Sequence, residues 1–412
     1  MIKKILKHTR NLLLIILGIG SLYLINLFFM KPYSIDHFLA KELILDLTSS
    51  PEELTYVGVL DDYNWLTNHN SKLSIPKESD IQDGIEHTEK VIKTLYKYND
   101  SRLSNTQKNT KKIAIFDYEN HLRELSEFPY LDYPLNQIGG IHLNTIEFMN
   151  DVHPIRKKSE AEDFIARTDL IKEVYNGVLD DLEKQAMNNI YPPEFVYGHV
   201  IKQLNEFIEY KDEDHPLYTQ FMSKIEKLDL NQEDTVYFEN EIRRSINESV
   251  TPGFELLRDF MRKTQQYANK NHGIWSQPGG DEYYKLKIRT FTTTDYSPEE
   301  IHQIGISEVK RISERMKYIL SSLGYDNTKS VGDLMNELNE NPDFLYADTP
   351  DRKEIVVRDY TEMVEEAYEV MKDYFHTMPE SKVIVKAVPE YSEKTAAGGY
   401  YQSPALDGSR PG

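Results

Sequence analysis

Glu299 and His302 form an E-x-x-H pair on a predicted helix, a spacing that can supply two metal ligands. Di-iron helical bundles use this unit, but they need a second copy and two further Glu on facing helices. The chain contains no second copy. Glu299 also has a structural explanation, because the dipole of a helix stabilises a carboxylate in its first turn. We therefore assign no metal to this pair.

The twelve His residues are not spaced for a zinc-binding helix. No two lie four residues apart and none is followed by Glu, so no H-E-x-x-H motif exists. Phosphate loops of the G-x-x-x-x-G-K and G-x-G-x-x-G types and the G-x-S-x-G nucleophile elbow are also missing. The lack of Cys excludes disulfides, thiolate metal sites and a Cys nucleophile.

The stretch 396–412, which reads AAGGYYQSPALDGSRPG, is the most unusual in the chain. It combines two adjacent Tyr, an Asp-Gly turn and an Arg fixed between Ser409 and Pro411. One interpretation is a surface loop that follows a strand. The other is a segment that lines a ligand site, because Tyr hydroxyls and an Arg guanidinium can hold carbonyl and carboxylate groups.

Helices are the elements that must position these residues. Ser50 and Ser297 each precede a Pro and have Glu three residues later, which predicts a capped helix start. Ser159 with Glu162 predicts a third start, and apolar residues follow it at helical spacing. A further helix is expected roughly over 352–376. The best strand signal is the β-branched segment 382–388, KVIVKAV.

The first thirty residues predict a membrane anchor. Four basic residues precede an uncharged run over 11–30, and about twenty apolar residues can span a hydrocarbon core. The basic flank should stay in the cytoplasm, which exports the body of the protein. A cleaved signal peptide is the alternative, although cleavage at its small-x-small site, 18–20, would leave an apolar new terminus. The basic residues are Lys3, Lys4, Lys7 and Arg10.

Charge restricts the classes of partner. The net charge is -20, and without the four basic residues of the first thirty it is -24. A body this acidic repels phosphate backbones, so we expect no nucleic-acid binding. The same charge argues against docking onto anionic lipid beyond the anchor itself. Zero Cys fits an extracytoplasmic bacterial protein.

Four stretches make the chain similar to the bacterial family catalogued as domain of unknown function 885 (DUF885), which is often described as metallopeptidase-like. Two of them are specific, the third and the fourth, and together the four are spread over nearly the whole body. They are 50–58 (SPEELTYVG), 133–149 (YPLNQIGGIHLNTIEFM) with 152–155, 279–305 (GGDEYYKLKIRTFTTTDYSPEEIHQIG) and 399–412 (GYYQSPALDGSRPG).

The resemblance implies a mainly α, multi-helix zincin-like body, here with a small β element near its C-terminus and one N-terminal transmembrane helix. Members of the family typically continue into a helix with an H-E-x-x-P-G-H-H type motif, whose His would bind zinc and whose Glu would act as base. This chain stops before that helix. We therefore expect an N-terminal fragment, with a cytoplasmic tail (1–10), an anchor (11–30), a helical region (31–272) and an incomplete zincin-like region (273–412).

The resemblance also implies a substrate-binding segment. Five residues match the family segment that leads into the zinc helix and would line the cleft, with the Arg holding a carboxylate and a Tyr donating to an oxyanion. They are Tyr400, Tyr401, Asp407, Ser409 and Arg410.

Two main functions stay open from the sequence, beside a di-iron bundle that would depend on Glu299 and His302 alone. In the first, the complete protein is an exported, membrane-anchored zinc peptidase, and residues 1–412 alone are inactive, hold no zinc and are less stable than the whole. In the second, the chain is a non-enzymatic tethered helical module that binds peptides or an envelope partner.

Overall fold

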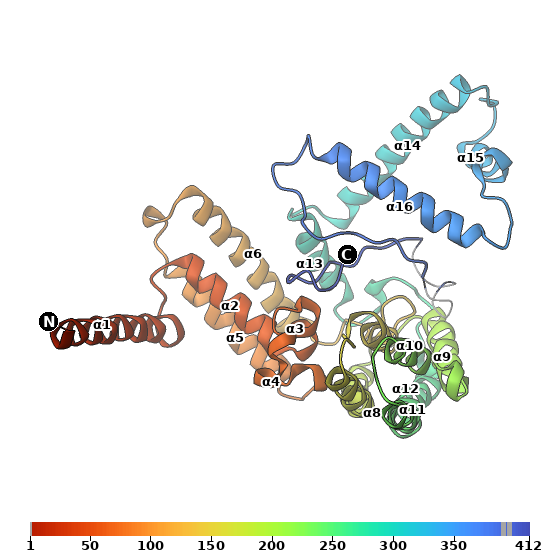
Figure 1. Ribbon diagram of the computed structural model, residues 1–412. Coiled ribbons are helices and arrows are strands. Elements are labelled where there is room, and N and C mark those ends of the chain that lie inside the picture. The colour runs from red at the N-terminus through yellow and green to blue at the C-terminus, as the bar shows by residue number, and fades with distance from the viewer. Residues whose placement is uncertain (1, 389–392, 394–397) are drawn as a thin grey trace. The chain divides into compact units, whose positions relative to one another are not determined.

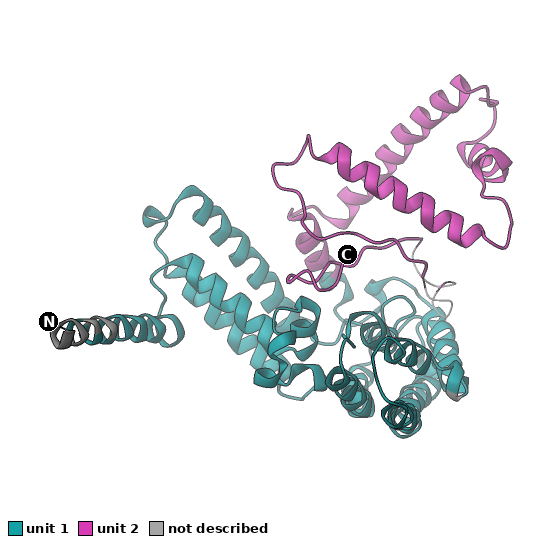
Figure 2. Cartoon of the chain, viewed as in Figure 1, with its two compact units in different colours: residues 1–283 teal, residues 284–412 magenta. Residues whose placement is uncertain are grey.

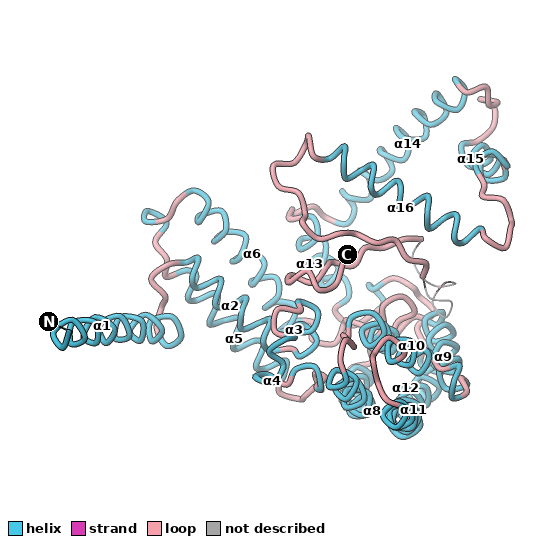
Figure 3. Tube along the Cα trace, in the orientation of Figure 1, coloured by secondary structure: helices cyan, strands magenta, loops and turns pink. Residues whose placement is uncertain are grey.

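Helices make up the regular structure of the protein, in a computed structural model that describes residues 2–388, 393 and 398–412. Within these residues no strand forms, and one isolated parallel bridge joins Pro193 to Asn269 (Figure 3). The predicted mainly α class is therefore confirmed. The chain separates into two compact units, residues 1–283 and residues 284–412 (Figure 2). The predicted division at 272/273 remains a prediction.

Figure 1 shows the order of the helices along the chain. The α-helices are α1 (Ile2–Phe29), α2 (Ile35–Ser49), α3 (Pro51–Val57), α4 (Asn64–Thr67), α5 (Asp80–Tyr96), α6 (Asn105–Glu127), α7 (Ile141–Glu147), α8 (Lys158–Met187), α9 (Glu194–Glu209), α10 (Pro216–Ile225), α11 (Gln232–Ser245), α12 (Thr251–Thr264), α13 (Gly280–Thr292), α14 (Pro298–Ser322), α15 (Val331–Glu340) and α16 (Arg352–Met371). Two π-helical turns, η4 (Phe148–Val152) and η6 (Ile246–Val250), extend α7 and α11. Short 3-10 turns are η1 (Asp61–Tyr63), η2 (His69–Ser71), η3 (Asp100–Arg102), η5 (Asp212–Asp214), η7 (Gln265–Tyr267), η8 (Ile274–Ser276) and η9 (Pro342–Phe344).

The predicted anchor, residues 11–30, lies almost entirely within α1. Among the side chains that the structure describes, no helix is both long and apolar enough to cross a membrane. The side chains of Leu12 and Leu13, inside the predicted span, lie outside the described set. The helix is thus confirmed, and the transmembrane part of the prediction is not.

Two of the three predicted helix starts are confirmed. The Ser297 hydroxyl accepts the N–H of Glu300, whose carboxylate accepts the Ser297 N–H in return, which completes a capping box. The Ser50 hydroxyl accepts the N–H of Glu53. Ser159 is wrong as a cap, because α8 begins one residue before it. The buried Glu160 organises that entry instead, since its carboxylate accepts the Arg156 backbone N–H at 2.6 Å.

The core of unit 1 is built around α8. This helix packs against α11, α12, η2 and η6, while α12 packs against α9. Aromatic side chains fill the contacts: the rings of Phe164 and Phe221 have centroids 4.9 Å apart, and Tyr175 meets Phe254 edge-on at 5.5 Å. All four are fully buried, and each contributes about 1.5–3 kcal/mol by leaving water.

A smaller cluster holds the antiparallel α5–α6 hairpin against α2. Phe38 of α2 packs among Val91 and Leu95 of α5, and Tyr98 closes the cluster next to the α5–α6 turn. Its position matters because α2 follows α1 directly, so the hairpin lies where the chain leaves the predicted anchor (Figure 1).

The predicted β element at 382–388 is wrong. Its backbone makes two hydrogen bonds to Gly412: Gly412 N–H donates to Lys382 O at 3.0 Å, and Ile384 N–H donates to Gly412 O at 2.8 Å. These two bonds have the pattern of a single parallel pair centred on Val383, and one pair is too little for a strand. The predicted helix over 352–376 is present as α16 and ends earlier, at Met371.

Candidate functional site

The C-terminal stretch folds into a tight turn. Ala405 N–H donates to Arg410 O at 2.9 Å, and Gly408 N–H donates to Ala405 O at 3.0 Å. The Asp407 carboxylate accepts the Ser409 N–H at 2.9 Å. Gly408 has φ of 75°, a left-handed conformation that favours glycine. The Asp-Gly turn expected from the sequence is therefore formed.

This turn places the five predicted substrate-binding residues within one short segment. Tyr400 and Tyr401 are 55% and 63% exposed, and Asp407 and Ser409 lie on the surface of the turn. Arg410 is half-buried, and one of its guanidinium nitrogens donates to Ser403 O at 2.9 Å. The guanidinium is thus oriented by the turn. The substrate-binding role of all five remains a prediction.

Extended backbone lies next to the turn. The hydroxyl of Tyr401 is 2.9 Å from the position that a Cβ on Gly412 would occupy, so its ring packs against that glycine. Gly412 in turn pairs with 382–384. Beyond residue 384, the backbone of 385–388 makes no hydrogen bond to another described residue. The arrangement combines exposed aromatic rings, an oriented guanidinium and non-helical backbone at 382–388.

A second polar assembly lies in unit 1, around the fully buried Arg167 of α8. Its guanidinium donates to Lys72 O at 2.8 Å, to the Thr55 hydroxyl at 2.6 Å and to His69 O at 2.9 Å. It also meets His153 Nδ1 at 2.8 Å. Burial lowers the pKa of Arg167 to about 10, and the side chain therefore stays cationic at neutral pH.

Further charged groups lie around the residues that contact Arg167. Asp61 is buried and lies 3.2 Å from His69 Nε2 and 3.4 Å from the guanidinium of Arg156. Arg156 also pairs with the buried Glu160 at 2.9 Å. Burial, with the neighbouring Arg167 cation, holds the pKa of His153 well below its usual value, so its ring stays neutral.

Two of the stretches that carry the family resemblance meet at Arg167. Thr55 belongs to 50–58 and His153 to 152–155. The sequence reasoning did not single out Arg167. The spacing could have indicated that Arg167 is buried, because it lies three residues after Phe164 and four before Ile171, on the same face of the helix. The hydrogen bonds of Arg167 all join it to other residues of the protein. We therefore assign this assembly the structural role of holding α3, η2 and α8 together.

No metal site is formed by the part of the chain that the structure describes, where no three His, Asp or Glu side chains come together to hold an ion. Glu299 and His302 are both exposed on the first turns of α14, and Glu299 accepts a hydrogen bond from Gln303 at 3.2 Å. His142 and His215 are buried instead, and burial lowers the pKa of each to about 4. The described residues therefore do not fit a zinc ion.

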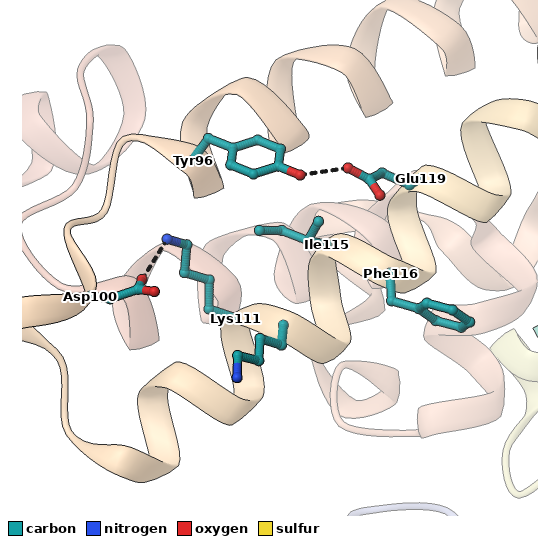
Figure 4. A pocket seen from close by; sticks show the side chains of 7 residues that line it. Tyr96, Asp100, Lys111, Ile115, Phe116 and Glu119 are labelled. Carbon is teal, nitrogen blue, oxygen red and sulfur yellow. Dashed lines mark hydrogen bonds and ion pairs between the residues drawn. The ribbon is translucent and has the colours of Figure 1, made fainter. Parts of the chain in front are cut away.

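A pocket of about 300 Å³ lies on the α5–α6 hairpin (Figure 4). Four of its polar side chains are engaged in pairs: Lys111 pairs with Asp100 at 2.7 Å, and the Tyr96 hydroxyl donates to Glu119 at 2.7 Å. The remaining lining residues are Lys112, Ile115 and Phe116. This pocket has no catalytic set of residues.

Comparisons with known proteins give a family and a fold. The chain matches the structure of a protein from Colwellia psychrerythraea, provisionally described as a lipoprotein, with 27% identity and a TM-score of 0.80. It also matches a protein of unknown function from Shewanella oneidensis, again provisionally described as a lipoprotein, with 13% identity and a TM-score of 0.55. No curated protein matches.

The matches cover 90% and 87% of this chain but only 66% and 61% of the two solved chains. The chain therefore spans less than two thirds of the length of these relatives. The family model described as "Bacterial protein of unknown function (DUF885)" matches residues 51–412. Since this match covers most of the sequence, the chain belongs to the DUF885 family of bacterial proteins.

Proposed function

We propose that the chain is the membrane-anchored, peptide-binding body of a bacterial envelope protein. The observation that carries this proposal is the C-terminal assembly, in which the exposed Tyr401 packs against Gly412, whose backbone pairs with 382–384, and Arg410 is oriented by the neighbouring turn. An extended peptide can add to such backbone through main-chain hydrogen bonds. Tyr and Arg are also the side chains most enriched where binding energy concentrates.

Each group has a role in this proposal. The N–H and C=O groups of 385–388 bind the peptide backbone, and Arg410 binds a peptide carboxylate. Tyr400 and Tyr401 provide rigid amphipathic surface for the side chains of the ligand. Asp407 and Ser409 hold the turn that orients the arginine, through the hydrogen bond between them.

Peptide binding can be measured by fluorescence anisotropy with labelled short peptides of random sequence and the full chain in lipid nanodiscs. Tyr401→Ala and Arg410→Gln should each weaken binding by at least tenfold, the loss typical of aromatic and arginine anchors. Tyr374→Ala is the matched control, since Tyr374 is 77% exposed elsewhere in the same unit. Peptide affinity unchanged by Tyr401→Ala, or reduced equally by the control, would contradict the proposal.

The anchor is the second part of the proposal. The described side chains of α1 between residues 14 and 30 include many large apolar groups that are exposed, among them Leu17, Leu22 and Phe29. A helix that is apolar all round is stable when protein or lipid covers it. Basic residues before the run favour a cytoplasmic N-terminus. The solved relatives, provisionally described as lipoproteins, are consistent with a place in the envelope.

Membrane attachment through α1 is tested by alkaline carbonate extraction of bacterial membranes. The full chain should stay in the membrane pellet, and a chain that starts at Lys31 should be released. A full chain released by carbonate would contradict the anchor.

Zinc-dependent peptide hydrolysis is the second candidate function, and it applies to a longer protein. It rests on the family resemblance, which implies a zinc helix after the matched region, and it is compatible with the parts of both solved relatives that this chain does not match. The described residues do not fit zinc, so we derive no catalytic step from them. Hydrolysis of peptides by the longer protein, abolished by a chelator and restored by zinc, is the expected result. Hydrolysis that a chelator leaves unchanged would remove this candidate.

A further inference from the structure

The tip of the α5–α6 hairpin lies against the residues where α1 ends. We define the hairpin tip as residues 97–112. The Lys31 ammonium donates to Lys97 O at 3.1 Å, and the Tyr98 hydroxyl donates to Pro32 O at 2.7 Å. Lys31 also lies 4.5 Å from the centre of the Tyr98 ring. The hairpin tip is therefore held at the exit of α1, as Figure 1 shows.

The hairpin tip reverses the charge of the body. Residues 97–112 contain five basic side chains and one carboxylate, Asp100. Asp100 pairs with the buried Lys111 at 2.7 Å, so these two charges offset each other. The remaining four have no ion-pair partner among the described residues, and they lie at least partly in solvent. They are Lys97, Arg102, Lys108 and Lys112.

Acidic groups around the hairpin tip do not cancel this charge. Asp36, at the start of α2, accepts a hydrogen bond from Gln107 at 2.7 Å and is the carboxylate that α2 brings to the tip. Counted together, residues 30–36 and 97–112 hold six basic and two acidic side chains, a net charge of +4. Glu119 lies further along α6, where it accepts the Tyr96 hydroxyl. A basic surface thus stands out on a strongly acidic protein.

The neighbouring end of α1 has the side chains of a membrane interface. Phe29 and Met30 are 84% and 67% exposed, and Tyr33, three residues later, is 80% exposed. Tyr is enriched at the level of lipid headgroups, just outside the apolar run of an anchor. Lys31 lies between these residues. The hairpin tip therefore lies beside the end of α1, at the level where lipid headgroups would surround the anchor.

We propose that the hairpin tip binds anionic phospholipid headgroups at the membrane surface from which α1 emerges. This inference rests on the proposed anchor, and it locates a second, electrostatic contact that fixes the body relative to the bilayer. Each Lys or Arg near an anionic surface strengthens association by roughly fivefold. The acidic remainder of the body is repelled by the same surface, so the contact orients the protein as well as holding it.

The zero Cys count makes a site-specific test direct. The full chain with Asn109→Cys, a change on the exposed surface of the hairpin tip, is reconstituted into vesicles and labelled with a membrane-impermeant fluorophore. Lipids with a nitroxide on the headgroup then quench the fluorophore only at short range. One set of vesicles contains phosphatidylcholine alone, and the other also contains phosphatidylglycerol.

The inference predicts strong quenching in the vesicles that contain phosphatidylglycerol and weak quenching in phosphatidylcholine. Quenching should fall in about 1 M NaCl, where the Debye length is about 3 Å. The triple change Lys97→Gln, Arg102→Gln and Lys112→Gln should weaken headgroup association on the order of a hundredfold, which brings quenching to the phosphatidylcholine level. A control triple change neutralises three exposed lysines elsewhere in unit 1 and should leave quenching unchanged; these are Lys202, Lys227 and Lys270.

Two outcomes overturn the inference, and they are distinguishable. If the protein stays in the vesicles after an alkaline wash but quenching is the same with and without phosphatidylglycerol, or the two triple variants behave alike, the anchor stands and the lipid contact is wrong. If the alkaline wash releases the protein, the anchor and the lipid contact are both wrong.

Discussion

Replacing Arg167 by methionine should destabilise unit 1 far more than replacing any exposed arginine. The guanidinium is fully buried and donates to groups from α3, η2 and the loop that follows it. Methionine fills most of the same space and removes every donor. Apart from His153, the residues that lose a partner come from segments more than ninety residues earlier in the chain, so the loss should loosen the junction between those segments and α8.

The magnitude follows from the acceptors left behind. Lys72 O and His153 Nδ1 have no other donor among the described residues. The Thr55 hydroxyl keeps its hydrogen bond to Asn70. Two abandoned acceptors at about 1–3 kcal/mol each give a loss of roughly 2–6 kcal/mol. Because methionine also removes the cost of burying a charge, we expect a value in the lower half of this range, about 3 kcal/mol.

Amide hydrogen exchange is the appropriate assay, because a chain with two units need not unfold in one step. Exchange of the slowest α8 amides should accelerate roughly a hundredfold, which corresponds to about 3 kcal/mol of opening free energy. Arg123→Met is the matched control on α6, where the arginine makes an exposed i,i+4 pair with Glu127. That change should cost about 0.5 kcal/mol or less.

The reasoning would be refuted if Arg167→Met accelerated α8 exchange by less than about fivefold, a change of about 1 kcal/mol. It would also fail if exchange increased only in unit 2. Arg167→Lys separates charge from geometry, since one ammonium cannot reach acceptors on three segments at once. That variant should be destabilised at least as much as the methionine variant.

Three further predictions concern single positions. Burial lowers the pKa of His215 to about 4. As the pH drops from 6.5 to 4, this histidine is protonated in the unfolded chain before it is protonated in the folded one, so the stability of the fold decreases. His215→Asn should remove up to roughly 3 kcal/mol of that loss in acid-unfolding titrations. A Cβ on Gly177 would lie 2.8 Å from the carbonyl oxygen of Pro76, so Gly177→Ala should cost about 1–3 kcal/mol in denaturant unfolding, whereas Gly198→Ala, in open space on α9, should be neutral or stabilising. Ser297→Ala removes the hydroxyl of a capping box and should speed exchange in the first turn of α14 by about fivefold, or about 1 kcal/mol; unchanged exchange there would count against it.

The helices were predictable because local signals determine them. Phe164, Ile171, Tyr175 and Val178 stand at helical spacing, and all four are buried on α8. The Ser297 capping box depends on contacts between residues three apart, which sequence displays directly. The Asp-Gly turn at 407–408 is similar, since a short side chain and a glycine define its backbone.

Features that depend on distant partners were not predictable. Arg167 is one residue in a regular helical pattern, and all its acceptors except His153 come from segments more than ninety positions away. The β-branched segment 382–388 resembles a strand, yet strand formation needs pairing along its length and it has one backbone pair. The net charge did not indicate the basic hairpin tip, because a sum over the whole chain contains no information on where each charge lies. The position of the tip at the end of α1 depends on tertiary contacts between Lys31 or Pro32 and the hairpin, which the sequence does not display.

Single-cysteine labelling tests the central claim, a body held outside the cytoplasm by α1, most directly. Asn271→Cys is exposed in unit 1, and the native chain has no Cys to interfere. In intact bacterial cells with a permeable outer layer, a membrane-impermeant maleimide should label this cysteine fully and should not label one placed within residues 2–10 until the cells are lysed. Labelling of the residue 2–10 cysteine in intact cells, or protection of Asn271→Cys until lysis, would contradict the account.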